Sequence, residues 1–239
     1  FCVLTMLPLA LVLRRRAPVG VAQVAAGGPA PKSARFLGRS DPNRPLGLSP
    51  LGLQMLLCVA GVSCCVAMSM PQVHIVAYCT DLGFGAARGA QMLSLMMAAG
   101  IASRLLSGWV SDHIGGLRTL MLGSVLQGVA LLLFLPFDGL VPLYVVSGLF
   151  GLFQGGIVPS YALIVREYFT PAQAGARVGT VLMATLLGMA LGGWLSGAVF
   201  DWTGTYRAAF VNGIAWNLVN VGIVGFLLLR VHRSLKATA

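Results

Sequence analysis

Residues 107–115 read SGWVSDHIG and residues 196–204 read SGAVFDWTG, so Ser, Gly, Val, Asp and Gly recur in register at a constant offset. Each stretch closes a long, mostly apolar segment with an aspartate, Asp112 in the first and Asp201 in the second. Small residues are common in membrane helices, so chance is one explanation of the match. An internal structural repeat is the other.

The composition around these stretches indicates a membrane protein. Of 239 residues, 57% are hydrophobic and only 9% are charged, against roughly 25% charged residues in soluble proteins. The mean hydropathy of +0.87 also excludes a disordered chain. The five cysteines lie in or beside apolar stretches and show no metal-binding spacing, so neither a metal site nor a disulfide scaffold is expected.

The spacing of charged residues divides the chain into membrane spans. About 20 apolar residues cross the hydrocarbon core of a bilayer. Six spans of this length are expected after the basic segment that ends at Arg44: 51–70 with an extension through Tyr78, 89–111, 119–137, 140–165, 178–200 and 208–229. Pro71 is expected to end or kink the first of them. Phe1 to Leu13 resembles the end of a truncated membrane helix.

The loop charges predict the orientation, because cytoplasmic loops retain Lys and Arg. Threading the spans alternately puts Arg88 and Arg207 on one side and thirteen basic residues on the other. The thirteen are Arg14, Arg15, Arg16, Lys32, Arg35, Arg39, Arg44, Arg118, Arg166, Arg177, Arg230, Arg233 and Lys236. We therefore expect a basic cytoplasmic linker at 14–48 and a cytoplasmic tail at 233–239. Topology explains the formal charge of +10, and no nucleic acid partner is expected.

The orientation gives the repeat its meaning. Asp112 ends a span that runs inward, whereas Asp201 ends one that runs outward. Matching segments on opposite faces are typical of the inverted repeats of secondary transporters. The six spans of residues 49–232 are then two inverted three-helix repeats.

On these features the sequence resembles the C-terminal half of a major facilitator superfamily transporter. The resemblance implies an all-α integral membrane fold, a six-helix half of a twelve-helix bundle, with a missing N-terminal six-helix half as its partner. The stretch GWVSDHIGGLRTL is similar to a loop motif of the family, with Gly108, Asp112, Gly115 and Arg118 in matching places. These four residues are expected to act as a conformational switch. His113 stands where the family usually has Arg or Lys.

Within the superfamily, three stretches resemble bacterial monocarboxylate and oxalate/formate-type transporters: MPQVHIVAYCTDLG, GIASRLLSGWVSDHIGG and VPSYALIVREYF. The resemblance implies that Arg104 binds a substrate carboxylate. The animal monocarboxylate branch has an Asp where this chain has Gly100, and the oxalate exchangers use a Lys that the 178–200 span lacks. A bacterial inner membrane is the expected location.

Arg104 can also be interpreted without the family, because an arginine deep in a span costs at least about 2.5 kcal/mol unless it faces protein or water. It lies roughly 6 Å from the middle of its span, at 1.5 Å per residue. Gly100 and Gly108 lie one turn before and after it, which leaves room for a carboxylate held by the planar guanidinium. A structural pairing with the missing half is the alternative.

Two further polar residues are candidates for substrate binding. His74 follows Pro71 and is either a titratable group in a vestibule or an interfacial histidine bonded to backbone. Gln154 lies among Gly151, Gly155 and Gly156, where it either lines a cavity or joins helices. The asparagines of the last span, 212, 217 and 220, are expected to make packing hydrogen bonds.

The function predicted from the sequence is secondary transport of a small organic anion, in the lipid bilayer and without a cofactor. Motifs of metalloproteases, serine hydrolases and nucleotide-binding enzymes are absent from the sequence, so no enzyme is expected. The alternatives are a non-transporting orphan half or scaffold, and efflux of another solute.

Overall fold

A computed structural model describes residues 45–237, and these form helices and no strands. The helices are α3 (Pro50–Asp81), α4 (Ala86–Ile114), α5 (Gly116–Leu133), α6 (Leu140–Gln154), α7 (Ile157–Tyr168), α8 (Pro171–Thr203) and α9 (Tyr206–Ala237), after a short 3-10 turn, η2 (Pro45–Gly47). All belong to the unit formed by Lys32–Ala239. With α6 and α7 counted as one segment, six segments are long and apolar enough to cross a membrane, which confirms the six predicted spans.

The helix ends follow from local sequence. Ser49 caps α3, because its Oγ accepts a hydrogen bond from the Gly52 amide at 3.1 Å, and Pro50 occupies the first turn, where no amide donor is missed. Gly115 and Gly204 follow α4 and α8 with φ of 86° and 65°, a backbone conformation that favours glycine. The two closing glycines of the repeated stretches therefore share a positive φ but differ in ψ, which is 158° at Gly115 and 13° at Gly204.

Three predicted boundaries differ from the structure. α3 continues through Pro71 to Asp81, so of the two expected outcomes, an end or a kink at the proline, the structure excludes the end: Pro71 is buried among neighbouring helices, an environment in which membrane helices tolerate proline. The predicted span 140–165 is two helices, broken at Gly155 and Gly156. α9 remains helical to Ala237, so the expected tail at 233–239 is largely part of that helix.

The N-terminal predictions are mostly outside the described residues. This applies to the truncated helix at 1–13 and to the linker as far as residue 44. The last residues of the linker do not lie free. Leu46 is buried in the core, and the Gly47 carbonyl lies 3.5 Å from Nη1 of Arg230.

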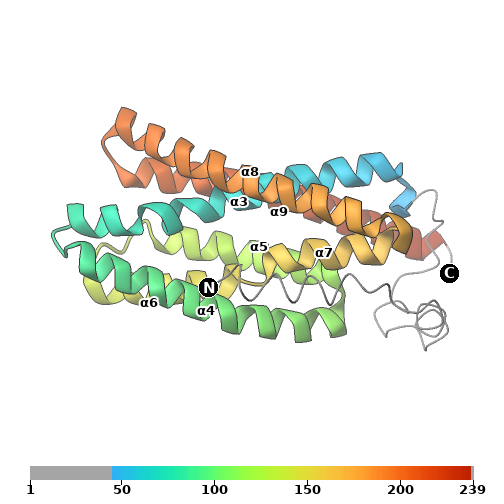
Figure 1. The fold of residues 1–239 in the computed structure, drawn as a ribbon, viewed down its shortest axis with the longest axis horizontal. Helices are drawn as coiled ribbons and strands as arrows, with labels where there is room; N and C mark the ends of the chain where they lie inside the picture. The colour runs from blue at the N-terminus through green and yellow to red at the C-terminus, as the bar shows by residue number, and fades with distance from the viewer. Residues whose placement is uncertain (1–44, 238–239) are drawn as a thin grey trace, which may run out of the picture. The chain divides into compact units, whose positions relative to one another are not determined.

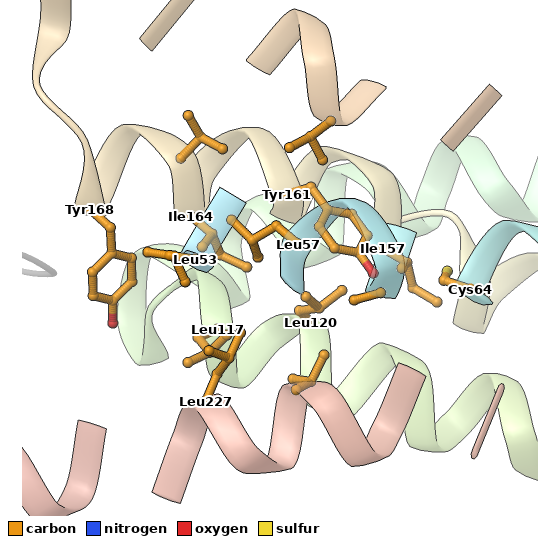
Figure 2. Close-up of a cluster of buried hydrophobic side chains, with 14 of the residues drawn as sticks. Leu53, Leu57, Cys64, Leu117, Leu120, Ile157, Tyr161, Ile164, Tyr168 and Leu227 are labelled. Carbon is orange, nitrogen blue, oxygen red and sulfur yellow. The ribbon is translucent and has the colours of Figure 1, made fainter. Parts of the chain in front are cut away.

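α3 is the central helix of the described part, and it packs most extensively on α8 and α9 (Figure 1). α4 packs mainly on α6, and α5 lies against α6, α7 and α9. Figure 2 shows one core cluster, in which Leu53 and Leu57 of α3 approach Tyr161 and Ile164 of α7 beside Leu120 of α5.

Glycines bring α3 and α8 close together. A Cβ added to Gly188 would lie 2.7 Å from the Val62 carbonyl oxygen, and one added to Gly192 would collide with Ser69. Gly188 and Gly192 of α8 therefore allow close helix contact with α3.

A buried hydrogen-bond network joins four helices. The Tyr161 hydroxyl of α7 donates to Oδ1 of Asn220 at 3.0 Å, and the amide nitrogen of Asn220 donates to the Ser124 hydroxyl of α5 at 2.8 Å. Asn217 donates to Gln127, whose amide oxygen also accepts from the Cys64 thiol of α3. Asn217 and Asn220 therefore make packing hydrogen bonds, as predicted.

Candidate functional site

Arg104 lies on an exposed part of α4. The helix runs from Ala86 to Ile114 without a break, and the arginine is about four residues, or roughly 6 Å, from its middle. The side chain is exposed, and among residues 45–233 it has no hydrogen-bond or ion-pair partner. An arginine at this depth is a functional candidate because its charge has no counter-charge in the described part of the chain.

The glycines on either side of Arg104 differ in their surroundings. A Cβ added to Gly108 would meet no described atom within 4 Å, whereas one added to Gly100 would lie 3.7 Å from the Gly151 carbonyl oxygen of α6. The space expected beside the guanidinium is therefore present on the Gly108 side. On the Gly100 side the space is filled by α6.

The contact between α4 and α6 positions Gln154. Added Cβ atoms at Gly151, Gly155 and Gly156 would collide with Met96, Gly100 and Ser107 of α4, so the two backbones approach closely there. The break between α6 and α7 falls at this contact, directly after Gln154.

Gln154 is 4% exposed, and its Oε1 has no hydrogen-bond partner among the described residues. A buried amide oxygen without a partner costs free energy, so a hydrogen bond to this atom would stabilise the helix break.

His74 lies elsewhere. Its Nε2 is 3.1 Å from the Gly193 carbonyl oxygen of α8, and a Cβ added to Gly197 would lie 3.7 Å from its Cε1. The histidine thus belongs to the contact between α3 and α8, bonded to a backbone carbonyl. Of the three predicted substrate residues, Arg104 and Gln154 lie on helices that pack together, and no described contact joins His74 to either.

The four motif residues surround the turn from α4 to α5. Gly115 forms the turn with a φ of 86°, a value that favours glycine. Asp112 is exposed at the end of α4, and Arg118 is exposed at the start of α5. Asp112 has no partner among residues 45–233 and is available to a group outside the described part.

Glu167 was not among the predicted site residues. Its Oε1 accepts a hydrogen bond from the Gly116 amide at 3.1 Å, so a carboxylate of α7 caps the first turn of α5. The signal in the sequence was that Glu167 is the only glutamate of the chain. This contact fixes the motif turn to the end of α7.

The opposite end of the described part carries an ion pair between Asp138 and Arg207. Asp138 accepts a hydrogen bond from the Tyr78 hydroxyl at 2.7 Å and pairs with Arg207 at 3.3 Å. The side chains of Arg207 and Asp138 are substantially exposed, so their ion pair contributes little stability. Together with the Tyr78 hydrogen bond, it joins the ends of α3 and α9 to the loop before α6. No group of three metal-ligating side chains occurs in the described part.

Comparison with known proteins identifies relatives. A family model described as Major Facilitator Superfamily matches residues 55–239. Monocarboxylate transporter 13 of Rattus norvegicus is 33% identical over 157 residues, which are 65% of this chain and 37% of the relative. The MFS-type transporter opdF of Penicillium oxalicum is 25% identical over 184 residues, which are 75% of this chain and 42% of the relative. Probable anion transporter 5 of Arabidopsis thaliana is 31% identical over 54% of this chain and 31% of its own.

Solved structures share the fold. A peptide transporter POT (E310Q mutant) crystallised with alafosfalin superimposes with a TM-score of 0.67 at 18% identity, covering 81% of this chain and 40% of that one. Tetrameric PepTSo2 gives a TM-score of 0.66 at 22% identity, with 77% and 41% covered. The chain therefore spans about two-fifths of these relatives.

Proposed function

This chain belongs to the major facilitator superfamily, a family of membrane transporters and not of enzymes, and we propose that it transports a small organic anion of the monocarboxylate class. In this proposal it works by alternating access, as the C-terminal six-helix half of a twelve-helix protein. The monocarboxylate and anion transporters among its relatives support the substrate class.

The observation that carries the proposal is the exposed guanidinium of Arg104 near the middle of α4. A charge at this depth is retained when it faces water or a binding partner, and a planar guanidinium holds a carboxylate with two parallel hydrogen bonds. Gln154, at the helix break beside α4, supplies a polar atom without a partner for the same solute or for a bound water. His74 is a further proposed substrate-binding residue, at the contact between α3 and α8.

The uneven burial of the helices supports a second half. Within an apolar 18-residue stretch of each helix, 61% of the residues are buried in α3, but only 22% in α8 and 11% in α4. The exposed faces of α4 and α8 need lipid or protein to cover them, and the superfamily's second six-helix half would cover the side that carries Arg104 and Asp112.

The charge distribution supports an orientation with the C-terminus inside. Five arginines lie at helix ends on the same end of the described part as the α4–α5 turn: Arg118, Arg166, Arg177, Arg230 and Arg233. Arg88 and Arg207 lie at the other end. By the positive-inside rule the first end is cytoplasmic. The chain is an integral membrane protein, and the bacterial inner membrane stays a prediction, because the relatives named above come from an animal, a fungus and a plant.

The test replaces Arg104 in the transporter that contains this half and compares uptake of a monocarboxylic acid with uptake of its amide. Arg104→Lys keeps the charge but loses the fork, so most affinity for the acid should be lost. Arg104→Gln should lower it further and abolish the preference for the acid. Both rates are normalised to folded protein, and an unchanged acid-over-amide preference in the variants would contradict the proposal.

Two alternatives have their own outcomes. A non-transporting half or scaffold predicts that the transporter assembled with a second half shows no saturable uptake, while the chain still folds and inserts. Efflux of another solute predicts uptake or release that is indifferent to the negative charge of the substrate. In either case Arg104 would have a structural role, and its variants would lower folded yield instead of substrate preference.

A further inference from the structure

Two exposed apolar residues of α4 lie on the same side of the helix as Arg104, toward its N-terminal end. Ile101 is one turn before the arginine and about 60° from it around the helix, and Met97 is two turns before it and about 20° from it. Their side chains are 65% and 44% exposed. Met97 and Ile101 therefore continue the surface of α4 that carries the guanidinium.

The other directions along this side of α4 offer a bound solute less contact. Toward Gly100 the space is filled by α6, because an added Cβ would lie 3.7 Å from the Gly151 carbonyl oxygen. At Gly108 an added Cβ would meet no described atom within 4 Å, so that side is open. Side chains of an α-helix also lean toward its N-terminus, so we expect the guanidinium to lie on the Ile101 side of its own Cα.

The exposed surface of α4 in this region is apolar. Between Ser94 and Arg104 the exposed residues are Leu95, Met97, Ala98, Ile101 and Ala102. Ser103, a polar residue of the same stretch, is buried. A group that passes along this stretch from Arg104 meets hydrocarbon and thioether groups of α4.

We infer that Met97 and Ile101 determine the specificity of the transporter for the tail of its substrate: with the carboxylate at Arg104, an unsubstituted aliphatic tail lies against these two side chains. The inference rests on the proposed function. Because the tail is covalently attached to the carboxylate, one end of it is fixed at the guanidinium. Ile101 is about 4.5 Å and Met97 about 10 Å from Arg104 along the helix axis, so Ile101 contacts the first carbons and Met97 the end of the tail.

Competition by straight-chain acids for uptake tests this in the transporter that contains this half. Each methylene buried against apolar side chains gives about a fourfold gain in affinity. Wild type should therefore bind propionate about fourfold, and butyrate about fifteenfold, more tightly than acetate. Met97→Ala combined with Ile101→Ala should reduce the gain from acetate to butyrate to about twofold. Ile101→Ala alone should reduce it to about fourfold and is the measurement to use if the double variant does not fold.

Two further variants separate tail contact from other effects. Met97→Leu combined with Ile101→Val nearly keeps the apolar volume and should retain most of the gain. The matched control is Leu106→Ala in the same helix, because Leu106 is 56% exposed but lies about 160° from Arg104 around α4. It should leave the dependence on tail length unchanged. Affinities are compared among acids within one variant, so differences in folded yield do not enter.

Equal affinity for the three acids in wild type would overturn the inference, as would a dependence on tail length that Leu106→Ala lowers as much as the double alanine variant does. The outcome for the proposed function is separate, because the double alanine variant leaves Arg104 in place and should keep the preference for an acid over its amide. If that preference survives Arg104→Gln, the proposed function is wrong and this inference fails with it. If Arg104→Gln abolishes it but the double alanine variant still binds butyrate about fifteenfold more tightly than acetate, the carboxylate site stands and this inference alone is wrong.

Discussion

Gly188→Ala tests whether α3 and α8 touch through glycine. The new Cβ would lie 2.7 Å from the carbonyl oxygen and 2.8 Å from the Cα of Val62, both backbone atoms that cannot rotate away. Ordinary contact begins at about 3.4 Å, so the helices would have to separate by most of an ångström. Overpacking of this kind costs about 1–3 kcal/mol.

The matched control is Gly179→Ala in the same helix, where an added Cβ meets no described atom within 4 Å. Both variants gain up to about 1 kcal/mol of helix propensity, so the difference between them isolates the collision. The assay is thermal unfolding of the purified chain in detergent, followed by size-exclusion chromatography. We expect Gly188→Ala to melt several degrees below Gly179→Ala. Equal melting temperatures would refute the close contact.

Two further predictions concern the buried hydrogen-bond network and the α4–α5 turn. Asn220→Ala removes the partner of the Tyr161 hydroxyl and should lower the free energy of unfolding by about 0.6–2 kcal/mol. Asn212→Ala is the control, because its Nδ2 has no described partner, and it should lower this free energy less; equal losses in chemical denaturation would count against the network. Asp112→Asn in the transporter containing this half should slow exchange more than it weakens substrate binding, because Asp112 lies away from Arg104 on α4. A loss of affinity with exchange per bound substrate intact would place Asp112 in the substrate site.

The six spans could be predicted because charge spacing and helix length are properties of the chain itself. Pro71 could not be interpreted in the same way, since whether a proline ends a membrane helix depends on the neighbours that bury it. The break at Gly155 and Gly156 had a local signal in the paired glycines. The break lies where α4 packs closely on α6, and the spacing of residues along the chain does not predict which helices pack together.

The candidate site residues could likewise be predicted only where their role does not depend on neighbouring helices. Arg104 was identifiable from the cost of a charge within a span, which needs no knowledge of neighbours. His74 and Gln154 were both polar residues near a helix irregularity, and only their packing separates them: one is bonded to Gly193 of α8, and the other has a buried oxygen without a partner. Glu167 acts on a residue 51 positions earlier in the chain, so its role as a cap was not visible locally.

The uninterrupted course of α4 gives the proposed mechanism its simplest mechanical link. Arg104 and Asp112 lie on this one helix, about 12 Å apart along its axis at 1.5 Å per residue. Because a helix moves as a rigid element over such a distance, the proposed mechanism expects a contact made or broken at Asp112 to displace Arg104 with it. α4 is also the least buried of the six spans, whereas the turn after it is attached to α7 through Glu167. In the proposed mechanism, a change at the turn would thus reach the middle of the membrane through the helix that carries the proposed substrate residue.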